Sequence, residues 1–127
     1  MSNFKKKILI VDDESNIVTA LSFLMENAGY EIAFCYDGES AIDLVSEFLP
    51  DLVILDVMMP GLDGFSVAKY IRSQAILDHV GIIFLTAKGT SQDKVEGYDS
   101  GAESYIVKPF DNDEIIERVQ EVLLVSS

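Results

Sequence analysis

Four apolar runs without internal polar alternation are the feature that most limits how this chain can fold. They are rich in β-branched residues and read ILIV (8–11), LVIL (52–55), IIFL (82–85) and YIV (105–107). A strand is uniformly apolar when both faces of its sheet are covered, as in a parallel sheet. A fifth, more mixed run, EIAFCY (31–36), is typical of an edge strand. We therefore expect a five-stranded parallel sheet with helices on both faces.

Segments with helical spacing of apolar residues separate these runs. Besides a helix between residues 14 and 28, helices are expected at 40–48, after Gly64, at 91–101 and at about 113–124. The segment 91–101 contains glycine, so its apolar face is thin. Strand and helix alternate five times, which predicts a three-layer α/β fold with right-handed crossovers. The 127 residues, 49% of them hydrophobic, are expected to form one domain over residues 1–127.

Polar residues follow the apolar runs at their carboxyl ends. Asp12 and Asp13 follow the first run, Asp56 the run at 52–55, Thr86 the run at 82–85 and Lys108 the last one. The carboxyl ends of parallel strands share one edge of the sheet, where open α/β sheets bind ligands. If the three aspartates act together, the first and third strands must be neighbours, about 4.8 Å apart. The predicted strand order is therefore 2-1-3-4-5, that of a doubly wound, flavodoxin-like fold.

Three carboxylates and one amine at a shared edge predict a particular chemistry. Close carboxylates repel one another by about 4 kcal/mol per pair, and Lys108 offsets only one charge. An all-oxygen set of ligands favours Mg²⁺ over zinc. A carboxylate can then attack phosphorus while a metal and a lysine neutralise the phosphoryl oxygens. Asp56 has no adjacent acid and is the expected acceptor, whereas the paired Asp12 and Asp13 are the expected metal ligands.

Each of these residues also has a simpler interpretation. Asp12 and Asp13 could cap the following helix, and Asp56 could start the turn at MMPG. Thr86 could be an ordinary hydroxyl at the end of a strand, and Lys108 an ordinary surface lysine. The functional interpretation is favoured because all of them fall at one edge of the sheet, each after its own strand.

The composition excludes several other classes of function. The net charge of −13 and the single short basic cluster, Lys5 to Lys7, argue against direct nucleic-acid binding. No run approaches the ~20 apolar residues of a membrane span, so we expect no membrane segment and a cytoplasmic location. One histidine, His79, and one cysteine, Cys35, allow neither a Ser-His-Asp triad nor a His-rich zinc site nor an internal disulfide. We expect His79 on the surface and Cys35 as a buried thiol.

Four motifs resemble those of a known family. ILIVDDE, DLVILDVMMPGLDG, FLTA and GAESYIVKPF are similar, in order and spacing, to the receiver domain of bacterial two-component response regulators. The resemblance covers essentially the whole chain. It implies that a sensor histidine kinase or a histidine phosphotransfer protein passes a phosphoryl group from phosphohistidine to Asp56. It also implies a signalling switch rather than an enzyme, read by a downstream effector protein or by a fused output domain.

The resemblance further assigns roles to single residues. Asp13 and Asp56 would bind Mg²⁺ through their side chains, Asp12 through a water molecule and Val57 through its backbone carbonyl. The other implied features are a phosphoryl contact from Lys108, a cis peptide bond before Pro109 and tuning of the phosphoryl lifetime by Met58 and Lys88.

A conformational switch is part of the same expectation. Thr86 would move toward the phosphoryl group, and Tyr105 would turn inward into the space that Thr86 leaves. A plain core aromatic is the alternative role for Tyr105. A switch needs an element with two nearly balanced arrangements, and the fourth helix, with Gly89 before it and Gly97 inside it, is the expected one. Phosphorylation would then alter the face formed by the fourth helix, the fifth strand and the fifth helix.

Two other functions are compatible with this fold class. Phosphatases of the haloacid-dehalogenase type also form an aspartyl phosphate, but they need a second acid two residues after the nucleophile, where this chain has Met58. A flavin-binding module would need a phosphate-cradling loop after the first strand. The residues there are DDES, which would repel phosphate.

Overall fold

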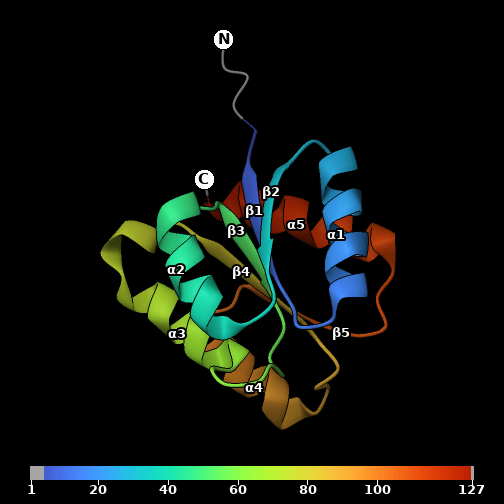
Figure 1. Cartoon of the computed structure of the whole chain (residues 1–127). Helices are drawn as coiled ribbons and strands as arrows, with labels where there is room; N and C mark the ends of the chain where they lie inside the picture. The colour runs from blue at the N-terminus through green and yellow to red at the C-terminus, as the bar shows by residue number, and fades with distance from the viewer. Residues whose placement is uncertain (1–4, 127) are drawn as a thin grey trace.

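The five expected strands form one parallel sheet in the computed structural model, which describes residues 5–126 (Figure 1). They are β1 (Lys7–Val11), β2 (Glu31–Cys35), β3 (Leu52–Leu55), β4 (Gly81–Thr86) and β5 (Ser104–Val107). Their order is β2-β1-β3-β4-β5, so the predicted flavodoxin-like α/β fold is confirmed. The predicted domain span, residues 1–127, includes residues 1–4 and 127, which lie outside the described residues.

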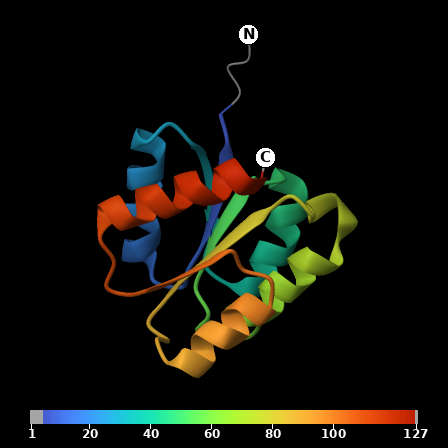
Figure 2. The same cartoon turned by 180° about the vertical axis from the view of Figure 1, so that it is seen from behind.

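Five α-helices connect the strands and cover both faces of the sheet. They are α1 (Ser15–Asn27), α2 (Gly38–Phe48), α3 (Gly64–Ser73), α4 (Ser91–Asp99) and α5 (Asn112–Ser126). Helices α1 and α5 lie on one face and α2, α3 and α4 on the other, as two opposite views show (Figure 1, Figure 2). A short 3₁₀ helix, η1 (Ala75–Leu77), precedes β4 and has no counterpart among the predicted elements.

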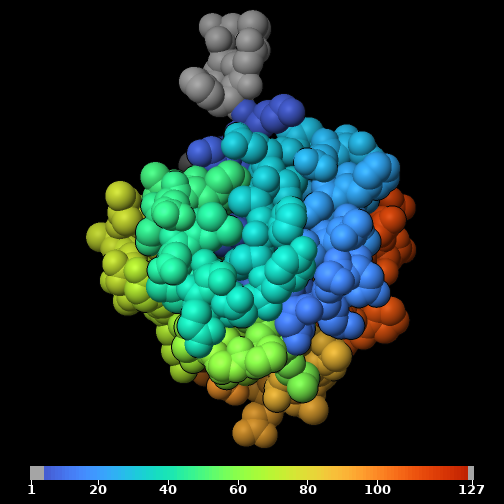
Figure 3. Space-filling view, viewed as in Figure 1, coloured from blue at the N-terminus to red at the C-terminus, as the bar shows by residue number. Residues whose placement is uncertain are grey.

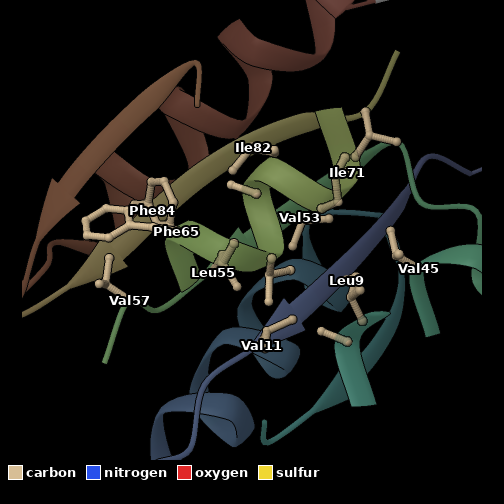
Figure 4. Packing of buried hydrophobic residues seen from close by; sticks show 14 of the residues in the cluster. Leu9, Val11, Val45, Val53, Leu55, Val57, Phe65, Ile71, Ile82 and Phe84 are labelled. Carbon is tan, nitrogen blue, oxygen red and sulfur yellow. The ribbon is translucent and has the colours of Figure 1, made fainter. Parts of the chain in front are cut away.

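The alternation of side chains along each strand divides the core into two layers. Leu9 and Val11 of β1 belong to the layer covered by α2 and α3, in which Val45 of α2 lies beside Leu9 (Figure 4). Ile8 and Ile10 face the other way and pack with residues of α1 and α5. These four side chains are 1% exposed or less. Covering on both faces explains why residues 8–11 of the strand are all apolar.

At the amino-terminal ends of the strands, the Arg72 side chain ties α3 to the starts of β4 and β5. Its guanidinium donates hydrogen bonds to the carbonyl oxygens of Val80 (2.7 Å) and Gly101 (2.9 Å). It also binds both carboxylate oxygens of Glu103, each at 2.9 Å. Glu103 in turn accepts a hydrogen bond from the backbone N–H of Ile82 (2.7 Å). This network fixes the ends of two neighbouring strands relative to α3.

Candidate functional site

The polar residues predicted from the strand ends gather at one edge of the sheet, the lower edge in Figure 1. The backbone N–H of Asp56 donates to the carbonyl of Val11 at 2.9 Å, so the contact between β1 and β3 continues into this edge. Asp12 and Asp56 are 2% and 4% exposed, whereas Asp13 faces solvent. The sheet therefore holds two carboxylates in a buried setting and leaves the third accessible.

Lys108 joins the carboxylates of this edge. Its Nζ lies 2.9 Å from Asp12 Oδ2, 3.3 Å from Asp56 Oδ2 and 3.0 Å from Glu14 Oε1. Its backbone N–H donates to the Thr86 carbonyl at 2.8 Å, and the Lys108–Pro109 peptide bond is cis. The end of β5 thus places an ammonium group among three carboxylates.

Burial and charge shift the pKa values of Asp12 and Lys108. Burial raises the pKa of the Asp12 carboxyl above its ordinary value of 3.8, and hydrogen bonds from the Glu14 backbone and from Lys108 offset only part of that rise. Burial alone would lower the pKa of the Lys108 ammonium. Its hydrogen bonds to Asp12 and Glu14 and the charge of Asp56 raise that pKa above its ordinary value instead. Lys108 is therefore charged at neutral pH and balances part of the negative charge.

Asp12, Asp13 and Asp56 are placed to share one metal ion. Each can offer a carboxylate oxygen, and these oxygens all lie within 4.8 Å of one another. The donors are all oxygen, and one side chain faces solvent, so water can complete the coordination of a bound ion. Mg²⁺ is a hard cation that binds through one or two carboxylates and keeps several waters. The residues present therefore fit the predicted magnesium site.

The backbone after Asp56 is fixed by a close approach to the start of α3. The Val57 carbonyl oxygen accepts a hydrogen bond from the Gly64 N–H at 2.9 Å, which leaves it one lone pair for another ligand. A Cβ at residue 64 would collide with the Asp56 carbonyl and would lie 2.8 Å from the Cα of Val57. Glycine at this position therefore allows α3 to hold the loop that carries the expected backbone ligand.

Thr86 and Tyr105 both bind the backbone of Lys88. Thr86 is fully buried, and its Oγ accepts a hydrogen bond from the Lys88 N–H at 3.3 Å. The Tyr105 hydroxyl donates to the Lys88 carbonyl at 2.6 Å. The two residues predicted to form the switch are therefore connected through one residue of the loop between β4 and α4.

The Tyr105 ring occupies a buried position between β4 and α4. It is 7% exposed and packs against Phe84, with ring centroids 5.7 Å apart. A Cβ at Gly97 would lie 2.6 Å from the ring, so α4 reaches Tyr105 only because residue 97 is glycine. Burial, together with the charges of Asp93 and Asp56, raises the pKa of Tyr105 to about 12. Its hydroxyl is therefore a hydrogen-bond donor across the physiological range.

Met58 and Lys88 line a hollow of about 480 Å³ that opens beside Asp13. The Met58 side chain is 58% exposed, and its backbone N–H donates to Asp56 Oδ1 at 3.2 Å. Lys88 Nζ lies 3.7 Å from a carboxylate oxygen of Asp93. The two residues predicted to tune the phosphoryl lifetime thus flank the open approach to the carboxylates.

Glu14 belongs to the site but was absent from the residues predicted to act there. Its carboxylate binds Lys108, a residue 94 positions away, although more than half of its side chain is exposed. The available signal was its place directly after Asp12 and Asp13 in the motif DDE. A third acid beside two others at a strand end indicates a group that shares the same counter-ion.

The expectations for Cys35 and His79 agree with their positions. Cys35 is buried, and burial raises the pKa of its thiol to about 11, which disfavours the thiolate needed for nucleophilic chemistry. His79 is exposed in the loop before β4. None of the helices in the part of the chain that the structure describes has the length and apolar character needed to cross a bilayer.

Comparisons with protein families and with curated proteins agree on one family. The family model described as the response regulator receiver domain matches residues 8–120. The alkaline phosphatase synthesis transcriptional regulatory protein PhoP of Bacillus subtilis is 45% identical over 118 residues, which are 93% of this chain and 48% of that protein. The chain thus spans about half the length of this curated relative.

Solved structures with the same fold cover nearly the whole chain. The chemotaxis protein CheY4 of Vibrio cholerae matches with a TM-score of 0.89 and 33% identity, covering 94% of this chain and 99% of that one. The receiver domain of the sensor histidine kinase PA1611 of Pseudomonas aeruginosa matches with a TM-score of 0.86 and 28% identity, covering 94% and 98%. That structure is described with a magnesium ion coordinated in its active-site cleft.

Proposed function

Since the chain belongs to the family of response regulator receiver domains, we propose that it is a switch in which Asp56 accepts a phosphoryl group. The donor would be the phosphohistidine of a sensor histidine kinase or of a histidine phosphotransfer protein. One observation carries this proposal. The buried Asp56 carboxylate lies 3.3 Å from the Lys108 ammonium and belongs to a group of three carboxylates able to share a metal ion.

The carboxylate of Asp56 is held by two donors. The Met58 N–H binds Oδ1 and the Lys108 ammonium binds Oδ2, which fixes the orientation of the nucleophile. One carboxylate oxygen forms a bond to phosphorus while the bond between phosphorus and the donor's histidine nitrogen breaks, and the imidazole leaves. The Lys108 ammonium then donates hydrogen bonds to the phosphoryl oxygens and balances their negative charge.

A magnesium ion would be held by Asp12, Asp13, Asp56 and the carbonyl oxygen of Val57. The three side chains meet the distance requirement for sharing an ion, and Val57 retains a free lone pair. Bound there, the ion would neutralise charge on the phosphoryl oxygens. The magnesium ion of the Pseudomonas aeruginosa receiver domain supports this assignment.

Thr86 and Tyr105 would convert the chemistry into a change of shape. A move of the Thr86 hydroxyl toward the phosphoryl group would break its bond to the Lys88 N–H. Lys88 also holds Tyr105 through its carbonyl, and α4 begins three residues later, at Ser91. The displacement would therefore reach the face of α4, β5 and α5, where an effector protein or an output domain would bind.

Turnover of an external substrate is the less favoured function. An aspartyl-phosphate phosphatase of the haloacid-dehalogenase type would need an acid at position 58, and the side chain there is an exposed methionine. We therefore propose a switch that assists only its own phosphorylation and dephosphorylation.

We further propose that residues 1–127 act as one receiver domain in the cytoplasm. PhoP of Bacillus subtilis is about twice as long as the matched segment, which is consistent with a fused output domain as one form of the partner. The net charge of −13 makes direct binding of nucleic acid by this segment unfavourable.

Intact-mass spectrometry tests the proposal. With acetyl phosphate and Mg²⁺, the chain should gain one acid-labile phosphoryl group, and chelation of the metal should prevent the gain. Asp56→Asn should show no adduct, whereas Asp43→Asn, which changes an exposed acid of α2, should behave as wild type. The same adduct on Asp56→Asn would refute the assignment.

A further inference from the structure

An aromatic patch is exposed where α1 meets the edge strand β2. We define it by Phe23 of α1, which is 68% exposed, and by Phe34 and Tyr36, which are 48% and 43% exposed. The rings of Phe34 and Tyr36 touch edge to face, with centroids 5.7 Å apart. Among residues 5–126, edge strand β2 pairs only with β1, and the view in Figure 3 shows α1 and β2 on the near face with no other coloured segment laid across them.

A hollow of about 280 Å³ lies within the patch. It is lined by the three rings together with Val18, Thr19, Ser22 and Glu26. It shares no lining residue with the hollow beside Asp13 or with the one beside Lys108. The buried Ser22 hydroxyl has no hydrogen-bond partner among residues 5–126. Buried polar groups are normally paired, so the packing around Ser22 at the base of the hollow is less complete than is usual in a protein interior.

The chain segment that forms the patch carries charged side chains of one sign only. Residues 8–68, which contain α1, β2 and α2, include no lysine or arginine, while acidic residues recur along this stretch. One of these acids, Glu26, is part of the wall of the hollow. The patch therefore combines exposed aromatic rings with a glutamate in the wall of its hollow, and this combination favours cations.

We propose that the aromatic patch is a docking surface for a cationic segment of a partner protein. Arginine or lysine side chains of that segment lie against the faces of Phe34 and Tyr36 and pair with Glu26, and one of them enters the hollow. Cation–π attraction and charge complementarity act together at such a surface. The proposal is independent of the phosphorylation chemistry.

A second copy of the chain is a poorer occupant. A symmetric dimer would place the same acidic surface of each copy against the other, in a molecule whose net charge is −13. The basic cluster of Lys5 to Lys7 lies at the other end of β2, where Lys7 is in register with Glu31. Phe34, by contrast, is in register with Ile10, nearer the carboxyl end of the strand.

The test is a binding titration with a defined probe. The probe is a fluorescein-labelled helical peptide of Arg, Leu and Ala with leucines at every third or fourth position, and the control peptide has Glu in place of each Arg. Fluorescence anisotropy should show binding of the first peptide only. Phe34→Ser, Phe23→Ser and Glu26→Lys should each weaken it by about tenfold, as expected for residues at the centre of an interface.

Matched changes outside the patch separate docking from general charge attraction. Ile76→Ser removes an apolar side chain that is 70% exposed on η1, and Glu117→Lys reverses an exposed charge on α5. Both variants should bind the peptide as wild type does. In NMR spectra of the wild-type chain, the amide shifts that the peptide causes should lie in α1 and β2.

Equal weakening of peptide binding by patch and control variants, or amide shifts spread over other elements, would overturn the proposal. Sedimentation that shows a dimer lost in Phe34→Ser would overturn it as well. Acetyl phosphate should still label Phe34→Ser, which shows that the variant is folded.

Discussion

At the scale of single residues, the site is held by one ammonium among several carboxylates. Lys108 contacts Asp12, Glu14 and Asp56, but one positive charge cannot balance these acids and Asp13 together. Without a metal ion, the site therefore stores repulsion that opposes folding. This repulsion is compatible with function because a bound cation or an added phosphoryl group changes the balance of charge among the same side chains.

Asp12→Asn should stabilise the metal-free chain at neutral pH. Burial raises the pKa of Asp12, so the folded state holds more protons than the unfolded state between 3.8 and the raised value. Stability consequently falls as the pH rises through that window, and the neutral variant lacks this loss. Urea unfolding in EDTA at pH 7 should show a larger free energy of unfolding for Asp12→Asn than for wild type. The gain should shrink as the pH is lowered toward 4.

The matched control for this change is Asp43→Asn, which removes an equal charge from the exposed face of α2. It should leave the urea midpoint unchanged. A less stable Asp12→Asn variant at pH 7 would show that the bonds of Asp12 to Lys108 and Glu14 outweigh its burial.

At the scale of elements, Arg72 joins three of them at the edge opposite the site. Arg72→Ala should lower the free energy of unfolding by about 2 kcal/mol, because the carbonyls of Val80 and Gly101 lose the Arg72 donor and Glu103 loses its ion pair. Arg118→Ala on α5, which loses its bond to the Ser104 hydroxyl, should cost less than half as much. Equal costs for the two variants in urea unfolding would contradict the role given to Arg72.

Helix α4 packs closely against Tyr105 of β5 at Gly97, which has no side chain. A change from glycine to alanine inside a helix normally stabilises it by about 1 kcal/mol. Gly97→Ala should instead destabilise the chain, since the new Cβ would lie 2.6 Å from the Tyr105 ring. NMR should show altered ring shifts for Tyr105. Lys94→Ala, at an exposed position of the same helix, should leave these shifts in place. A more stable Gly97→Ala variant with unchanged Tyr105 shifts would show that the ring has room to spare.

The strand order was largely predictable because chemically related side chains stand at the carboxyl ends of strands, and β1 and β3 must be neighbours for Asp12, Asp13 and Asp56 to meet. The bond between Glu14 and Lys108 was not predictable, since it joins side chains 94 positions apart and depends on how a long carboxylate is oriented. The helix η1 has three residues, too few for a periodic pattern. The bonds of Thr86 and Tyr105 to Lys88 depend on backbone positions in a loop, which residue types do not reveal.

At the scale of the whole molecule, two regions differ in charge and in use. The carboxylate edge combines acids with Lys108 and suits a metal ion and a phosphoryl group. The surface of α1 and β2 combines acids with exposed rings in a stretch without lysine or arginine. The scaffold between them is a doubly covered sheet in which residues 8–11 of β1 are buried on both faces, so both regions are built on rigid elements.

The central claim is that the phosphoryl group enters on Asp56, and chemical trapping tests it most directly. Borohydride reduces an aspartyl phosphate to homoserine, which peptide mass spectrometry can locate in the chain. After treatment with acetyl phosphate and Mg²⁺, homoserine should appear at position 56 and at none of the other aspartates of the carboxylate edge. Homoserine at position 12 or 13, or a labelled chain without homoserine at 56, would contradict the account.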